Sequence, residues 1–232
     1  MRRRSTYVGL LSAAIFWAGI ASAQSSFDIN MGLGAIQDPA SSTQLNQALA
    51  PCSGPNDPNG PCISTPSLSA FMLGFGGDVM LWKRFGVGGA VTIQPAQQSY
   101  VDLNSQAASQ GLSSFSLNSR MTLYDLNGVY EPVHTERFGV KLRGGFGGAN
   151  LKFYQSGSTT DSLVGTQNFS QYFASSNHFQ VHGGLGLQAY VMDHIFVRPE
   201  FEVYYVPNLT QQFGRNLVTE EMVWIGYSWG NR

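Results

Sequence analysis

The feature that most constrains this chain is a strict alternation of apolar and polar residues between positions 178 and 207. Apolar or small side chains occupy every second position from Phe179 to Val191, and the alternation resumes at Ile195 after a turn at 192–194. Because successive side chains of a β-strand point to opposite faces, this period of two predicts a hairpin whose two faces meet different surroundings. The polar face of its second arm carries three charged residues: Arg198, Glu200 and Glu202.

These charges, together with the length of the apolar face, indicate a membrane-spanning hairpin. A dry protein core does not tolerate unpaired charges, so the polar face must line an interior in which charges are paired. The apolar face continues for about the 9–11 residues that a tilted transmembrane strand needs. The hairpin is therefore typical of a small outer-membrane β-barrel. A secreted soluble barrel that binds a ligand inside is an alternative, but it would reverse this polarity.

The first 23 residues have the organisation of a targeting segment. A basic start at 1–4 precedes an apolar run from Tyr7 to Ile20, and small residues at 21–23 form a cleavage site. The apolar run is too short to be a spanning helix. We therefore expect residues 1–23 to be a cleaved signal peptide and residues 24–232 to form one barrel domain in a bacterial outer membrane.

Composition supports a barrel and argues against a nucleic-acid partner. Charged residues make up 12% of the chain, about half the share of an ordinary soluble domain, and there are 27 glycines. A net charge of −1 gives no basic stripe for nucleic acid. No cofactor is expected. The two cysteines, Cys52 and Cys62, flank a Pro/Gly-rich segment, and in an exported protein this spacing predicts a disulfide.

Alternating segments divide the rest of the chain into eight strands joined by long and short connections in turn. The expected strands cover 27–35, 68–82, 85–94, 115–130, a segment from 138, 178–191, a segment from 195, and one ending near Trp229. The expected long loops are 37–66, 95–114, 154–177 and 208–216. Short periplasmic turns and longer outside loops are typical of an all-β, eight-stranded antiparallel up-and-down transmembrane β-barrel.

The chain ends on an aromatic-x-aromatic sequence, Tyr227-Ser228-Trp229. With the strand pattern, this ending resembles the small eight-stranded outer-membrane β-barrel proteins, the group that contains the outer membrane protein A barrel and outer membrane protein X. The resemblance implies insertion by the barrel assembly machinery through the C-terminal strand. It also implies contact with outer-membrane lipid and lipopolysaccharide. Three residues, Gly230-Asn231-Arg232, continue past the aromatic ending, which departs from the group's pattern.

Inward positions of the expected strands carry a cluster of charged residues. An eight-stranded barrel is just wide enough for side chains to fill it, and buried charges must be paired. We therefore expect these residues to plug the lumen as a salt-bridge network. The alternative is a narrow pore for ions or small solutes, gated by rearranged pairs. The cluster comprises Asp78, Asp125, Lys141, Arg143, Arg198, Glu200 and Glu202.

A metal site and an enzyme are weaker interpretations of the two strand histidines. His178 and His182 are about 13 Å apart on one strand face, too far for shared metal ligation. Some eight-stranded barrels are lipid-modifying enzymes, and the deacylases among them carry a His-x-Ser-Asn run that neither histidine matches. The chain is therefore expected not to be an enzyme. A Ser-His-acid site assembled from separate loops remains open.

Aromatic residues at outward positions near the short turns predict an interfacial girdle on the periplasmic side. They are Phe85, Tyr130, Phe138, Tyr227 and Trp229. The long outside loops lie on a rigid scaffold, where function is often carried. The sequence thus predicts a structural or surface-interaction role, with a possible ligand bound by the outside loops.

Overall fold

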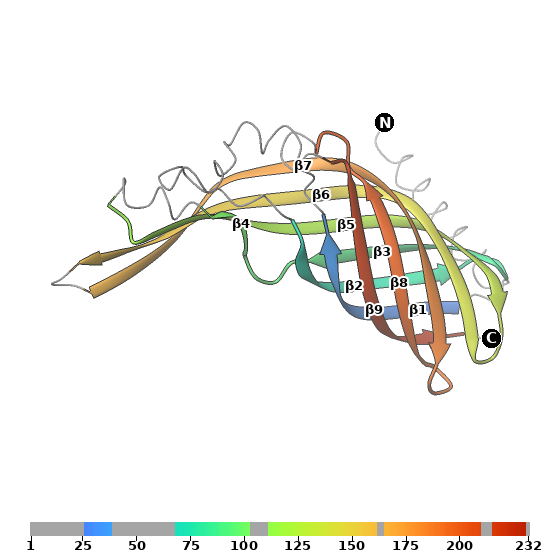
Figure 1. Cartoon of the computed structure of the whole chain (residues 1–232). Coiled ribbons are helices and arrows are strands. Elements are labelled where there is room, and N and C mark those ends of the chain that lie inside the picture. The colour runs from blue at the N-terminus through green and yellow to red at the C-terminus, as the bar shows by residue number, and fades with distance from the viewer. Residues whose placement is uncertain (1–25, 39–67, 103–110, 162–164, 210–214, 231–232) are drawn as a thin grey trace, which may run out of the picture.

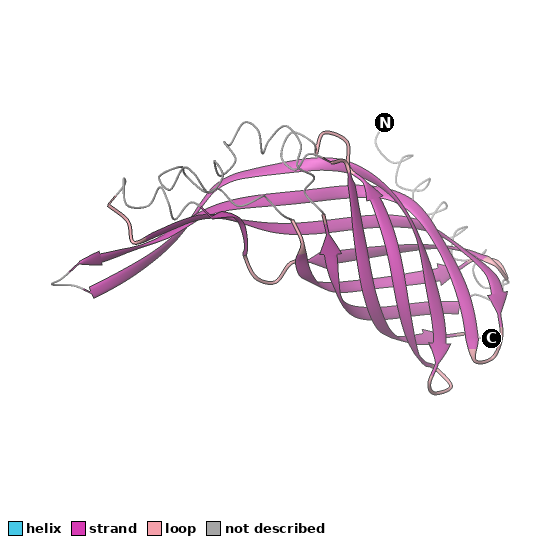
Figure 2. Ribbon diagram, in the orientation of Figure 1, coloured by secondary structure: helices cyan, strands magenta, loops and turns pink. Residues whose placement is uncertain are grey.

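A computed structural model describes residues 26–38, 68–102, 111–161, 165–209 and 215–230. Within these ranges the chain forms nine antiparallel strands (Figures 1 and 2). They are β1 (Ser26–Gln37), β2 (Ala70–Met80), β3 (Phe85–Ile93), β4 (Gln98–Asp102), β5 (Ser114–His134), β6 (Phe138–Asp161), β7 (Gly165–Tyr190), β8 (Ile195–Tyr205) and β9 (Leu217–Trp229).

Eight of these strands close into a barrel. Each strand of the order β1-β2-β3-β5-β6-β7-β8-β9 pairs with the next, and β9 pairs back with β1. The front strands cross the rear strands at an angle in Figure 2, as tilted strands do in a closed sheet. The predicted eight-stranded antiparallel barrel is therefore confirmed.

The alternation seen in the sequence becomes an inside and an outside. On β1, the side chains of Ile29, Met31 and Leu33 are exposed, whereas Asp28 and Asn30, which alternate with them, are buried. The same order repeats around the ring, so that apolar side chains cover the outer wall and polar ones fill the lumen. An apolar outer wall around a polar interior is the polarity of a barrel that spans a membrane.

Both described ends of the chain and the tight turns lie at one end of the barrel (Figure 1). Phe27 of β1 pairs with Trp229 of β9, and the turns at 81–84, 135–137 and 191–194 join the neighbouring strands there. We call this the turn end. No helix in the described ranges is long and apolar enough to span a membrane.

The predicted long loop at 154–177 is wrong, because β6 continues to Asp161 and β7 starts at Gly165. Serine, threonine, asparagine and glutamine suggested a loop in this segment, but hydroxyl and amide groups also bond between strands. Ser114 Oγ lies 2.7 Å from Ser158 Oγ, and Asn150 Nδ2 donates to Asn177 Oδ1 at 2.6 Å. Similarly, β4 falls inside the loop expected at 95–114.

These longer strands build a projection that we call the outer blade. It consists of β4 with residues 114–121 of β5, 150–161 of β6 and 165–180 of β7. The ring does not include it, because β3 pairs with β5 only from Thr122 to Tyr130 and β8 pairs with β7 only from Val181 onward. The blade curves away from the barrel at the end opposite the turns (Figure 1).

Candidate functional site in the lumen

All seven charged residues predicted for the lumen are buried inside the barrel. They come from β2, β5, β6 and β8. The alternation of side chains between the two faces of a strand, which we call parity, directs each of them inward. The structure brings six of them into one ion-pair network. The seventh, Asp125, lies 3.7 Å from the ring of His182 and accepts a hydrogen bond from Gln180.

Asp78 is the centre of the network. It is fully buried, and its carboxylate pairs with three cations that reach it from across the lumen. The nitrogen–oxygen distances are 2.5 Å to Arg143, 3.0 Å to Arg198 and 3.3 Å to Lys141. Since these cations stand on β6 and β8, Asp78 ties β2 to the opposite wall.

Glu200 forms a second centre beside Asp78. It pairs with Arg143 at 2.9 Å and with Arg198 at 3.0 Å, and Trp224 Nε1 donates to its Oε1 at 2.9 Å. Glu202 lies farther out, with its nearest cation, Arg143, at 3.7 Å. Two arginines therefore each bridge two carboxylates, which is the pairing that buried charges require.

Two buried carboxylates that contact these groups were not in the predicted cluster. Asp28 pairs with Lys141 at 2.5 Å, and its inward position follows from the alternation along the expected strand at 27–35. Glu220 lies in the first part of β9, which begins at Leu217, where the alternation of the expected strand ending near Trp229 is less distinct. Extending the alternation backward from Trp224 through Met222 would have placed Glu220 inward.

Three of the carboxylates gather around one hydroxyl group on the outer side of the network. Tyr204 Oη lies 2.8 Å from Glu220 and 3.3 Å from Asp125, and it also contacts Glu202. A phenol carries one proton and can donate it to only one acceptor at a time. This layer is thus acidic, whereas the three cations of the lumen lie nearer the turn end.

Beside the ion pairs, the lumen is filled by apolar side chains. Trp224 is 2% exposed, and the glycines facing it are required for the fit, because a Cβ at Gly74 would overlap the indole ring. Met222 packs next to it, and the apolar cluster continues to the outer end of the ring and onto the base of the blade. This cluster includes Ile36, Met72, Leu123, Leu151 and Val218.

The two strand histidines lie where parity puts them. His182 is buried against Asn127, and the ring of His178 lies 3.0 Å from Ser176 Oγ. In the described ranges no group of three or more His, Cys, Asp or Glu side chains could hold a metal ion.

The five aromatics predicted for the girdle lie at or near the turn end. Phe85 stacks on Tyr130 with ring centroids 4.8 Å apart, and Tyr227 contacts Trp229 at 4.4 Å. Phe138 is 40% exposed at the start of β6. Cys52 and Cys62, with the proposed signal peptide at 1–23, lie outside the described residues, so these predictions remain untested.

Comparison with known proteins adds similarity in overall shape only. No family model matches the chain, and no curated protein matches it. Among solved structures, Ail of Yersinia pestis in complex with the heparin analogue sucrose octasulfate is 13% identical, with a TM-score of 0.48, over 89% of this chain and 99% of that chain.

Two further outer-membrane proteins are similar in the same degree. OprG of Pseudomonas aeruginosa is 16% identical, with a TM-score of 0.48, over 90% of this chain and 98% of its own. A major outer membrane protein of Thermus thermophilus is 14% identical, with a TM-score of 0.49, over 88% and 99%. At this level of similarity the assignment depends on the closed ring of strands itself. From that ring, the chain has the architecture of the small eight-stranded outer-membrane β-barrel proteins.

Proposed function

We propose that this protein is a sealed outer-membrane barrel that serves as a scaffold for binding at the cell surface through its outer blade. Export through residues 1–23 and insertion through the C-terminal strand are parts of this proposal. The observation that carries it is the length of three strands. β5, β6 and β7 have 21, 24 and 26 residues, far more than the roughly 9–11 that crossing a bilayer needs.

The filled lumen supports a scaffold over a pore. Paired charges and the apolar cluster around Trp224 and Met222 together fill the lumen. A conducting path would have to separate buried ion pairs and wet an apolar layer, and both steps cost free energy. The pore is the alternative that the conductance assay below tests, and a lipid-modifying enzyme is the second alternative.

The chemistry of the blade favours a neutral, hydroxyl-rich ligand. Its β6 and β7 segments carry only two residues with full charges, Lys152 and Asp161, and are otherwise rich in hydroxyl and amide groups. Tyr172 and Phe173 are both 51% exposed there. Exposed aromatic rings beside hydrogen-bonding groups suit sugar rings, which have an apolar face and hydroxyl edges. A neutral glycan is therefore the proposed ligand class.

The test combines conductance with glycan binding. The protein refolded in a planar bilayer should be silent. On an array of neutral oligosaccharides, binding should fall about tenfold in Tyr172→Ala, since one aromatic contact contributes about 1.4 kcal/mol. Tyr205→Ala removes a similarly exposed ring from the barrel wall and should bind as the wild type does.

A hairpin-shortened variant provides a second readout. Ser156 pairs with Ser170, so residues 157–169 can be replaced by Asn-Gly without changing the barrel. This variant should keep heat-modifiable migration on a gel, and its glycan binding should fall, because it removes hydroxyl and amide groups of the blade while Tyr172 stays in place. Reproducible conductance steps would contradict the sealed barrel, and glycan binding that survives both blade changes would contradict the role of the blade.

A further inference from the structure

A band of the outer wall of the barrel lacks side chains. Five outward-facing glycines occupy five neighbouring strands, β2, β3, β5, β6 and β7, and we call this band the glycine trough. Register makes it continuous. Gly77 of β2 pairs with Gly89 of β3, and Gly89 pairs with Leu126 of β5. Gly128 is the next outward residue of β5 toward the turn end. It pairs with Gly144 of β6, which in turn pairs with Gly183 of β7.

At three of these positions neither backbone conformation nor local packing requires glycine. None of them has a positive φ, and an added Cβ would meet nothing closer than 3.6 Å at Gly128 and 3.8 Å at Gly144 and Gly183. The inward Gly32 and Gly74 differ, because there a Cβ would collide with Trp224. Glycine in a strand costs stability and otherwise marks a site where another group approaches the backbone closely.

Apolar side chains border the trough on both sides. On the side toward the blade, Leu126, Phe146 and Val181 form one registered row; on the side toward the turns, Tyr130, Leu142 and Leu185 form another. The two rows are four residues apart along each strand, about 13 Å between their Cα atoms. The row between them has only backbone where it crosses β5, β6 and β7, which leaves a channel one side chain deep.

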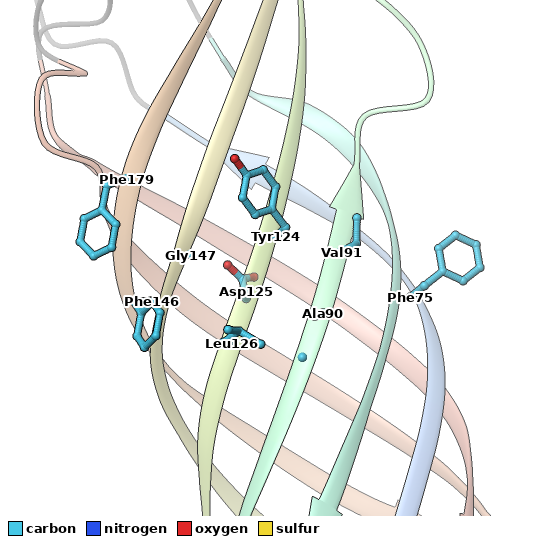
Figure 3. Close-up of a pocket in the computed structure, with 10 residues that line it drawn as sticks. Phe75, Ala90, Val91, Tyr124, Asp125, Leu126, Phe146, Gly147 and Phe179 are labelled. Atoms are coloured by element: carbon cyan, nitrogen blue, oxygen red, sulfur yellow. The ribbon is translucent and has the colours of Figure 1, made fainter. Parts of the chain in front are cut away.

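The trough opens into two larger grooves on the same wall. One, of about 640 Å³, runs along Gly77, Gly89, Gly128 and Gly144 and reaches Phe27 at the turn end. The other, of about 610 Å³, shares Leu126 and Phe146 with it (Figure 3). In Figure 3, Phe75 projects outward at one border of this second groove, and Phe146 and Phe179 project outward at the other.

We propose that the glycine trough binds one acyl chain of a phospholipid from the periplasmic leaflet of the outer membrane. This wall faces the bilayer, so hydrocarbon is what reaches it, and a trough without polar side chains offers no specific partner to a peptide. The turn end, where Phe27 stacks on Trp229 at 5.6 Å, is the periplasmic interface. The groove begins there, and a chain entering it belongs to the leaflet on that side. The inference does not depend on the function of the blade.

Photolabelling tests this assignment directly. The protein is refolded into vesicles of phosphatidylethanolamine and phosphatidylglycerol that contain phosphatidylethanolamine with a diazirine on one acyl chain. After irradiation, label should concentrate on the peptides of Leu126, Leu142 and Phe146. The wall at β9, which pairs with none of the five glycine-bearing strands, should carry at least fivefold less label at Ile225. Even labelling around the barrel would overturn the proposal.

Filling the trough provides the control. Gly144→Leu adds a side chain where a Cβ has room, and it should lower the label at Phe146 at least fivefold, whereas Val223→Leu on the far wall should not change it. Gly183→Val is an independent variant should Gly144→Leu fail the heat-modifiability check for folding. Label that persists in a folded filled variant would refute a bound chain. Labelling by a diazirine lipopolysaccharide instead of the phospholipid, or a crosslink to a second copy of the protein, would refute the assigned occupant.

Discussion

Removing the charge of Asp78 should destabilise the barrel far more than removing the charge of Asp125. Both residues are buried in the lumen, and Asp→Asn preserves the shape of either side chain. Asp78 pairs with three cations at 2.5–3.3 Å. Asp125 instead lies beside the Tyr204 hydroxyl, which also contacts the carboxylates of Glu202 and Glu220.

The expected magnitude follows from the remaining partners. Removing one member of a buried ion pair typically costs about 3–5 kcal/mol. In Asp78→Asn each cation keeps at least one other carboxylate, because Lys141 still pairs with Asp28, and both arginines still pair with Glu200. We therefore expect the lower end of that range, about 3 kcal/mol, which is roughly a hundredfold in the folding equilibrium.

Asp125→Asn should leave the free energy of unfolding unchanged or raise it. The amide oxygen can still accept the hydrogen bond from Gln180, and one negative charge is removed from an acidic layer. Both variants are unfolded with urea in lipid vesicles and followed by tryptophan fluorescence, with heat-modifiable migration as a check of folding. Equal destabilisation by the two substitutions would refute the division of the lumen into a cation-paired and an acidic layer.

Three further outcomes are expected. Trp224→Ala should lower the free energy of unfolding by about 3–5 kcal/mol, because it leaves a cavity and removes the hydrogen bond to Glu200; an unchanged urea midpoint would contradict this. Gly74→Ala should also destabilise, since its Cβ would meet the Trp224 ring, whereas Gly128→Ala should be tolerated; equal urea midpoints for the two variants would contradict the packing of the indole. Asp38, which follows β1 outside the membrane-spanning part, has a pKa raised by burial from 3.8 to about 7, against the lowering effect of Arg215. The folded protein therefore keeps the Asp38 proton to a higher pH than the unfolded chain does, so the free energy of unfolding should fall as the pH rises from about 4 to 7. Asp38→Asn should reduce this dependence of the free energy of unfolding on pH in urea titrations.

The barrel itself could be predicted from the sequence, because parity is a local property. The inward position of a residue such as Asp78 or Arg198 follows from the alternation along its own strand. Strands with one polar and one apolar face can cross a membrane as a closed barrel, with the polar face inside. Parity does not say which inward residues meet. The pairing of Asp78 on β2 with Lys141 and Arg143 on β6 depends on the stagger of the closed ring.

The outer blade could not be predicted, because local composition and tertiary pairing disagree there. The Ser- and Thr-rich ends of β6 and β7 have the composition of loops, yet each pairs residue by residue with the other, as Thr160 does with Thr166. The sequence also does not distinguish glycines that make room inside the barrel from glycines that leave the outer wall bare. Gly74 and Gly144 look alike in the sequence, but Gly74 makes room for Trp224 inside the barrel, and Gly144 opens the wall toward the lipid. The sequence alone determined which face each residue occupies, since a strand has a period of two. Only the tertiary structure decided what each face touches, because contacts across the lumen and along the wall join strands that are distant in the chain.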